Sequence, residues 1–248
     1  MTGQLLHKFR NHGPLSRRTK FLILALVPVY FMAAGLFLQP LNEVLKGIIT
    51  IIREPDFLIT DYIAIGGIGA AFINAGVLAL ISIAIVYYLG MEMSGHTITS
   101  CFLMFGFSLF GKNILNIWSI MMGVCLYAFY HKTSVTRYIY VGFYGTSLSP
   151  IITQLMTVGH LPLAVRLPFS ILVGMIIGFV LPPLSTHTHY SHKGYSLYNV
   201  GFASGIIATV IVSLMRSFGL QTEARLIWST GNDVLFARLL LGLFGGMI

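Results

Sequence analysis

The chain has 248 residues, of which 56% are hydrophobic and only 9% are charged, and its mean hydropathy is +0.85. Because soluble domains carry about 25% charged residues, this composition excludes an ordinary soluble protein and indicates an integral membrane protein. The net charge of +8 comes largely from five basic residues among the first twenty. No recognition motif accompanies them, so we expect a lipid bilayer and no nucleic acid as the partner of this segment.

The first apolar run follows this basic cluster directly. Phe21–Leu38 is free of charge, and its length suits a helix that crosses a bilayer core about 30 Å thick. A basic flank beside a first span favours the cytoplasmic side. We therefore expect residues 1–20 to be a basic cytoplasmic N-terminal segment and residues 21–248 to be a transmembrane domain in the plasma (inner) membrane.

Two segments after the first span depart from a plain spanning helix. Residues 41–53 place apolar side chains at helical spacing on one face, which predicts an amphipathic helix at the membrane interface or a short core helix. Ile63–Leu89 is longer than an untilted span requires, and Gly66, Gly67 and Gly69 lie in its first half. It is either a tilted span or a short half-helix followed by a span.

The middle of the chain holds short and interrupted apolar segments. Thr97–Gly111 is too short to cross alone, whereas Asn113–Tyr130 is of spanning length. If Thr97–Gly111 crosses as a buried short span, the basic loop at residues 131–137 falls on the N-terminal side. If it is re-entrant and Ile63–Leu89 is one span, that loop falls on the opposite side. Tyr138–Gly159 is broken at residues 145–150. Interrupted backbone at membrane depth must be buried in protein or line a cavity, which predicts a channel or transporter site.

The last third of the chain contains two further spans and a short apolar run at its end. Leu167–Leu181 and Tyr195–Met215 are apolar, and two prolines and a histidine-rich loop separate them. Leu239–Ile248 is a final apolar run, so we expect a sequence truncated before its remaining spans. The expected fold class is all-α: a polytopic transmembrane helix bundle with short or broken helices.

An internal duplication is one interpretation of two similar motifs. Phe72–Val77 and Leu197–Phe202 share an apolar-x-Asn-x-Gly-apolar pattern at an offset of 125 residues. Two repeats of about 125 residues, arranged as an inverted repeat, would explain this likeness. Chance similarity between apolar segments would explain it equally well.

The candidate spans contain few ionisable side chains, so the residues that could carry a function are neutral and polar. Amides and hydroxyls both donate and accept hydrogen bonds, which suits a path for a neutral polar solute or the anchoring of interrupted backbone. Hydrogen bonding between helices is the structural alternative, and the glycines beside these residues would then serve helix packing. The candidate solute-path residues are Asn74, Asn116, Ser147, Ser149, Asn199, Gly76 and Gly201.

One cluster has the spacing of a metal site. His187, His189 and His192 form an H-x-H-x-x-H pattern, and imidazole is a good ligand for zinc, copper or nickel. No carboxylate or cysteine lies nearby in the sequence to complete or orient such a site, so a solvated loop is the other interpretation. We assign no metal and no other cofactor.

A glycine-rich stretch carries a resemblance to known families. Gly194–Ile206, together with Phe110–Asn113 and Trp118–Gly123, resembles a bacterial family of multi-pass membrane proteins of unknown function, domain of unknown function fifteen seventy-six. This resemblance implies many spans and membrane transport without an established substrate. Tyr198–Gly205 is also similar to the aromatic-Asn-Gly-x-Leu-x-x-Gly motif of urea transporters, but it departs from that motif at Val200.

These observations together predict a membrane channel or secondary transporter for a small, neutral polar solute, and not an enzyme. A membrane-embedded metal-dependent enzyme that uses the three histidines is one alternative, and a non-conducting scaffold subunit is another. The expected partners are the lipid bilayer, the solute and, in a homo-oligomer, further copies of the chain.

Overall fold

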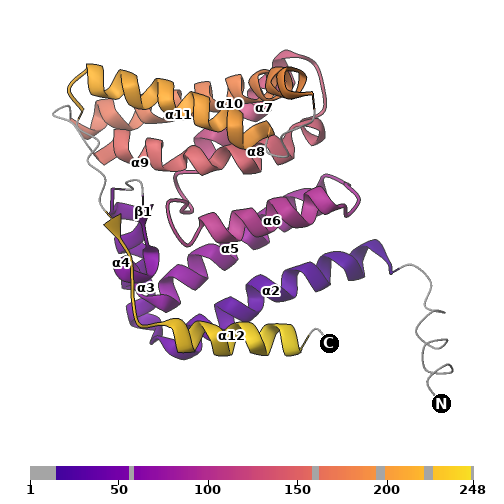
Figure 1. The fold of residues 1–248 in the computed structure, drawn as a ribbon, viewed down its shortest axis with the longest axis vertical. Coiled ribbons are helices and arrows are strands. Elements are labelled where there is room, and N and C mark those ends of the chain that lie inside the picture. The colour runs from indigo at the N-terminus through magenta and orange to yellow at the C-terminus, as the bar shows by residue number, and fades with distance from the viewer. Residues whose placement is uncertain (1–14, 56–58, 158–161, 194–198, 221–225, 247–248) are drawn as a thin grey trace.

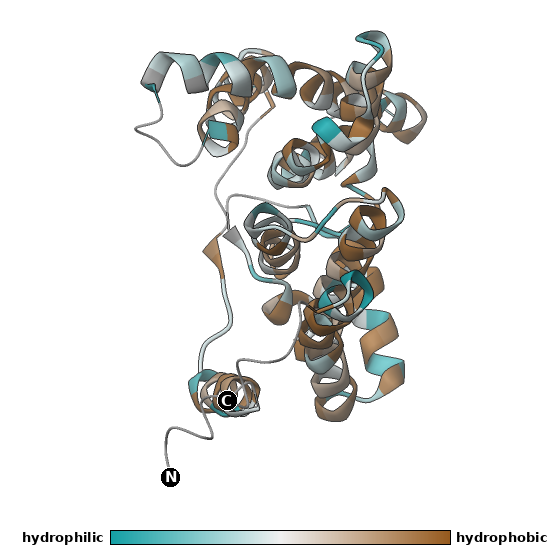
Figure 2. Ribbon diagram, turned by 90° about the vertical axis from the view of Figure 1, so that its right-hand side faces the viewer, coloured by the Kyte–Doolittle hydropathy of each residue, from teal (hydrophilic) through white to brown (hydrophobic). Residues whose placement is uncertain are grey.

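The protein is a bundle of α-helices arranged in two layers. The computed structural model describes residues 15–55, 59–157, 162–193, 199–220 and 226–246. Figure 1 shows the N-terminal helices and the last helix in one layer, with the helices from the second half of the chain in the other. Hydrophobic residues predominate along most of the helices (Figure 2). Four of the described helices are long and apolar enough to cross a membrane, which confirms the prediction of an all-α, polytopic membrane protein.

The first pair of long helices, α2 (Arg17–Leu38) and α5 (Ile68–Tyr88), runs antiparallel. At one end of the pair, the guanidinium of Arg17 donates hydrogen bonds to two carbonyls at and just after the end of α5. At the other end, Gly35 lies against Gly69, so close that a Cβ on Gly35 would be 3.1 Å from the Gly69 carbonyl oxygen. Small residues therefore let the two backbones approach, as is common between membrane helices.

Two short helices, α3 (Leu41–Arg53) and α4 (Tyr62–Gly66), connect this long pair. α3 packs one face against α4 and α5 and exposes a second apolar face, in agreement with the predicted amphipathic helix; the buried residues are Val44, Gly47 and Ile51, and the exposed ones include Leu41, Leu45 and Ile49. Gly67, with φ of +85°, separates α4 from α5. Ile63–Leu89 is therefore a half-helix followed by a span, one of the two predicted forms.

The middle of the chain forms three short helices, α6 (Gly95–Phe107), α7 (Trp118–Tyr130) and α8 (Ile139–Gly145). Thr97, in the first turn of α6, shares a hydrogen bond of 2.6 Å with the hydroxyl of Tyr140 at the start of α8. Tyr127, in the last turn of α7, packs on Tyr138 just before α8, with ring centroids 5.2 Å apart. The start of α6 and the end of α7 thus lie at the same end of the bundle, and these two helices are the arms of a hairpin.

This hairpin corrects the expectation that Asn113–Tyr130 is a spanning helix. α7 has only 13 helical residues, because turns and irregular backbone occupy residues 108–117 and Gly111 has φ of +91°. α7 returns to the end at which α6 begins. The loop at residues 131–137, which includes the 3₁₀ turn η1 (Val135–Arg137), consequently lies at the end of the bundle where α6 begins. α2 also starts at this end, because Arg17 donates to the Met91 carbonyl just ahead of α6. The sequence-based alternatives had tied this position of the loop to a crossing of Thr97–Gly111.

The second layer begins with a broken segment, as residues 145–150 predict. α8, the 3₁₀ turn η2 (Thr146–Leu148) and α9 (Ser149–Thr157) follow one another along the chain. Two long helices complete this layer, α10 (Leu163–His192) and α11 (Asn199–Ser217). α10 packs in parallel on α7, since Ser119 lies beside Gly174 and Gly123 lies beside Gly178 further along both helices.

α10 is longer than the sequence suggested, and it includes the residues expected to form a histidine-rich loop. It continues through Pro182 and Pro183 to His192. Each proline removes a backbone donor, which frees the helix carbonyls four residues earlier, those of Gly178 and Phe179. In the turn that follows, the hydroxyls of Ser185 and Thr186 both donate to the Pro182 carbonyl, at 2.9 and 3.0 Å.

The C-terminal segment of the described chain returns to the first layer. β1 (Ile59–Thr60) pairs in parallel with β2 (Leu226–Ile227), the two-stranded sheet of the described residues. The last helix, α12 (Asp233–Gly245), lies against α2, where the hydroxyl of Tyr30 donates to the Leu239 carbonyl at 2.9 Å. The final apolar run of the sequence is therefore helical as far as Gly245.

The proposed duplication at an offset of 125 residues stays a prediction. Asn74 lies within α5, whereas Asn199 is the first residue of α11. The two helix pairs that pack through glycines also differ in direction, because α2 and α5 run antiparallel while α7 and α10 run parallel.

The glycine contact between α7 and α10 should be sensitive to a single methyl group. A Cβ on Gly178 would clash with the Ile120 carbonyl oxygen, so Gly178→Ala must push the helices apart and should cost about 1–3 kcal/mol of folding free energy. Thermal unfolding in detergent measures this as a lower Tm. Gly205→Ala, on α11, is the matched control, because nothing lies within 4 Å of its Cβ position. Equal Tm values for the two variants would contradict the packing described here.

Candidate functional site

The two interrupted segments of the bundle meet at one buried place, which we call the polar junction. It comprises the connection between α6 and α7, residues 108–119, and the break between α8 and α9, residues 146–153. Gly111 of the first segment touches Pro150 of the second, and a Cβ on Gly111 would be 2.9 Å from the Pro150 ring. Most polar residues of both segments are buried. The junction therefore has the buried, irregular backbone that the sequence predicted for a site.

Two asparagines bond to each other's backbone in the turn that leads into α7. The Asn113 side-chain oxygen accepts hydrogen bonds from the Leu115 and Asn116 amides, at 3.0 and 3.1 Å. The Asn116 side-chain oxygen accepts in return from the Asn113 amide, at 2.9 Å. This is the geometry of a capping box with asparagine at both positions. The pair closes the turn at residues 114–117 that precedes α7, and Asn113 was missing from the predicted site.

Asn74 and Asn116 hold the connection in place. The Asn74 amide on α5 donates to the carbonyls of Ser108 and Lys112, at 2.7 and 2.8 Å. The Asn116 amide donates to the Gly111 carbonyl at 2.9 Å and to the hydroxyl of Thr153 on α9 at 3.0 Å. Of the roles that the sequence left open for these two residues, these contacts fit the anchoring of interrupted backbone. That they also line a solute path stays a prediction.

Lys112 is a fully buried lysine within the junction. Its side chain is 1% exposed, and its Nζ donates to the Phe143 carbonyl of α8 at 3.2 Å. The sulfur of Met104 lies 3.5 Å from Nζ, and the ring centroid of Phe107 lies 4.9 Å away. No carboxylate pairs with Lys112 among the described residues. The sequence analysis noted this lysine only as the end of an apolar segment. An ionisable residue in an otherwise uncharged membrane stretch indicates a functional site, and this was the signal in the sequence.

Two hydroxyls of the junction have no hydrogen-bond partner within the described part of the chain. Ser149, the first residue of α9, is fully buried, and Ser119, in the first turn of α7, is nearly so. A buried polar group without a partner costs about 1–3 kcal/mol, so each such group calls for an explanation. Ser147, two residues before Ser149 in the broken segment, is half-buried. The predicted residues Ser147 and Ser149 thus belong to the junction together with Asn116.

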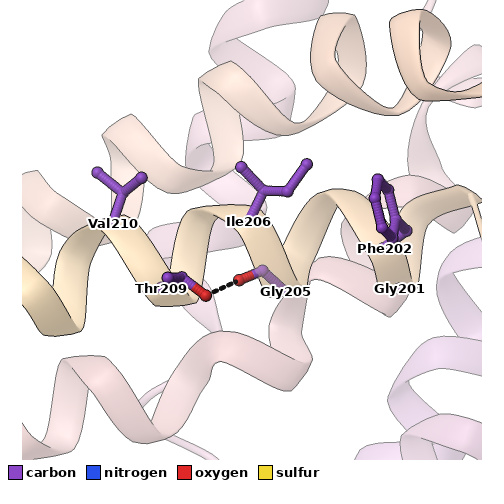
Figure 3. A pocket seen from close by; sticks show the side chains of 6 residues that line it. All are labelled: Gly201, Phe202, Gly205, Ile206, Thr209 and Val210. Atoms are coloured by element: carbon purple, nitrogen blue, oxygen red, sulfur yellow. Dashed lines mark hydrogen bonds between the residues drawn. The ribbon is translucent and has the colours of Figure 1, made fainter. Parts of the chain in front are cut away.

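The other predicted solute-path residues lie elsewhere. Gly76 packs on α2, and a Cβ there would clash with Met32. Asn199 accepts a hydrogen bond from Thr188 through its backbone carbonyl, at 3.4 Å. Gly201 lines a groove along one face of α11 (Figure 3), together with Phe202, Gly205, Ile206, Thr209 and Val210. A path shared by Asn74 and Asn199 stays a prediction.

The three histidines lie in the last part of α10. Residues two positions apart on an α-helix lie on different faces, so positions 187 and 189 do not share a face. His187 is exposed, whereas the side chains of His189 and His192 fall outside the described residues. Among the side chains that are described, no group of three histidine, cysteine or acidic residues could hold a metal ion.

Comparison with known families gives one match. Residues 41–217 match the model of the family described as "Protein of unknown function (DUF1576)", a range that covers the polar junction and the helices from α3 to α11. The chain belongs to this family. DUF1576 has no assigned function, and neither a curated protein nor a solved structure matches the chain significantly. The function of this DUF1576 protein must therefore be argued from its own site.

The anchoring role of Asn74 predicts a loss of stability when the amide is removed. Asn74→Leu leaves the Ser108 and Lys112 carbonyls without their donor, which should cost about 1–3 kcal/mol for each buried group. The thermal midpoint of the purified protein in detergent measures the effect. Ser170→Ala is the control, since this buried hydroxyl on α10 donates within its own helix, to the Leu167 carbonyl. If Asn74→Leu is as stable as wild type, Asn74 does not anchor the connection.

Proposed function

We propose that this DUF1576 protein is a membrane channel or secondary transporter for a small, neutral polar solute. The observation that carries the proposal is the polar junction, where two interrupted apolar segments meet between the two layers of the bundle. Irregular backbone at membrane depth is tolerated where it is buried in protein or lines a cavity, and broken helices are typical of transporter binding sites.

The chemistry of the junction supports a neutral solute. Its free groups are the hydroxyls of Ser119 and Ser149, which can each donate and accept a hydrogen bond. The surrounding amides and carbonyls are also uncharged, and Lys112 already has acceptors within the protein. The likeness of residues 198–205 to the urea-transporter motif points to the same class of solute, although Gly201 and Gly205 lie on the exposed side of α11.

The distribution of basic residues supports a cytoplasmic N-terminus in an inner membrane. Arg17, Arg18 and Lys20 lie at the end of the bundle where the loop with Lys132 and Arg137 also lies. An excess of Lys and Arg in short loops marks the cytoplasmic side. The arms α6 and α7 would then form a re-entrant hairpin that starts and ends at the cytoplasmic surface.

Flux measurements test the proposed function. In proteoliposomes, with urea and glycerol as probes, the wild-type protein should speed the entry of at least one probe, as read by stopped-flow light scattering. Ser149→Ala should lower this flux by about two- to tenfold, the loss expected for one hydrogen bond, without lowering Tm, because Ser149 has no hydrogen bond within the described protein.

Ser185→Ala is the matched control for this flux experiment, because Ser185 is buried on α10 but donates only to the Pro182 carbonyl of its own helix. It should leave the flux unchanged. Wild-type flux no faster than that of empty liposomes for both probes would contradict the proposal, as would equal flux in Ser149→Ala and wild type.

Thiol labelling tests the arrangement of the loops. Single cysteines at the exposed positions Ser16 and Ser134 should react with a membrane-impermeant reagent only from the cytoplasmic side, whereas Asn42→Cys on α3 should react only from outside. The background carries Cys101→Ala and Cys125→Ala, which removes both native thiols. Labelling of the Ser16 and Ser134 positions from opposite sides would refute the hairpin formed by α6 and α7.

A further inference from the structure

The contacts of Lys112 are those of a bound cation. Phe143, which accepts its hydrogen bond, lies in the last turn of α8, and Met104 and Phe107 lie in the last turn of α6. The carbonyls at a helix C-terminus carry partial negative charge, and an aromatic face attracts a cation as well. In transporters with broken helices, the C-terminal ends of half-helices coordinate the coupling Na⁺ or H⁺. The Lys112 ammonium thus occupies the kind of position that a coupling ion takes.

Burial disfavours the charged form of Lys112, and only neutral groups stabilise it. Removing an ammonium from water without a counter-charge disfavours its charged form, while the carbonyl, the thioether and the ring favour it. The helices packed around it carry no described carboxylate that faces it. The titratable side chains of α6 are His96 and Cys101, those of α8 are Tyr140 and Tyr144, and α5 presents the neutral Asn74.

We infer that Lys112 is a proton-binding site that changes charge during the working cycle, so that this protein is coupled to protons and not to sodium ions. The coupling rests on the proposed transport function, whereas proton binding at Lys112 does not. In the protonated state, the ammonium donates to the Phe143 carbonyl and links the hairpin tip to the second layer. When the proton leaves to water, the neutral amine loses this charge-assisted contact. The Phe143 carbonyl then keeps the hydrogen bond from the Thr146 hydroxyl, at 2.7 Å, so neither state leaves it without a donor.

Binding of a proton to Lys112 changes a contact between helices. The link between Lys112 and Phe143 joins the α6–α7 hairpin to α8, and so joins the segments on the two sides of the junction. Loss of the proton weakens that link but not the asparagine contacts that hold residues 108–116. Protonation can thus bias the position of α8 and α9 relative to the hairpin without unfolding it.

Nuclear magnetic resonance of the full chain in nanodiscs, labelled with ¹⁵N-lysine, tests proton binding directly. Lys46, Lys132 and Lys193 are exposed and serve as internal references. The signal that disappears in Lys112→Arg should titrate at clearly lower pH than these references. Lys112→Gln provides the same assignment if the arginine variant does not fold. A Lys112 signal that titrates together with the exposed lysines, or that stays neutral at every pH at which the protein is folded, would overturn the inference.

Urea flux in proteoliposomes tests the coupling separately. Wild-type flux should change at least severalfold when a pH gradient is imposed and should be the same in sodium and choline buffers, while Lys112→Arg, with its fixed charge, should lose the response to pH. A dependence on sodium, or an unchanged pH response in Lys112→Arg, would overturn the coupling. Titration of Lys112 without any flux would instead contradict the proposed function and leave the proton site standing.

Discussion

Satisfying the backbone where helices are interrupted is the constraint on which the rest of this structure depends. A break in a helix frees carbonyls and amides, and a membrane offers no water to pair with them. Gln39 meets this demand between α4 and α5, where its side chain accepts from the Gly69 amide at 2.8 Å. Asn74, Asn113 and Asn116 meet it between α6 and α7. Side-chain amides suit this purpose because each offers donors and an acceptor.

These amides also determine which parts of the chain come together. Asn74 ties the hairpin tip to α5 of the first layer, and Asn116 ties it to Thr153 of the second layer. The two layers are therefore joined through the interrupted segments as well as through apolar packing between α6 and α8. A site built in this way is a contact between two groups of helices, which is the arrangement that permits them to move relative to one another. Lys112 lies on that contact and is the one ionisable side chain described within the junction.

The sequence was informative wherever composition alone decides the outcome. Long charge-free runs predicted α2, α5 and α11, and small or polar residues inside such runs predicted the breaks at Gly67 and at residues 145–150. It was less informative where a long-range contact decides. That α7 turns back depends on Asn74 and Thr153, which lie far from the turn in the sequence. The two prolines at 182 and 183 predicted a helix end that the structure does not have, and the burial of Lys112 depends on α8.

The central claim is that residues 108–117, although not helical, are an internal and hydrogen-bonded part of the membrane domain. Amide hydrogen exchange of the protein in nanodiscs, read by mass spectrometry, tests this claim most directly. The account predicts that peptides covering residues 108–117 exchange nearly as slowly as those from α5, whereas the loop at residues 131–137 exchanges fast. Exchange of residues 108–117 as fast as that of the 131–137 loop would contradict it, because the connection would then be an ordinary surface loop.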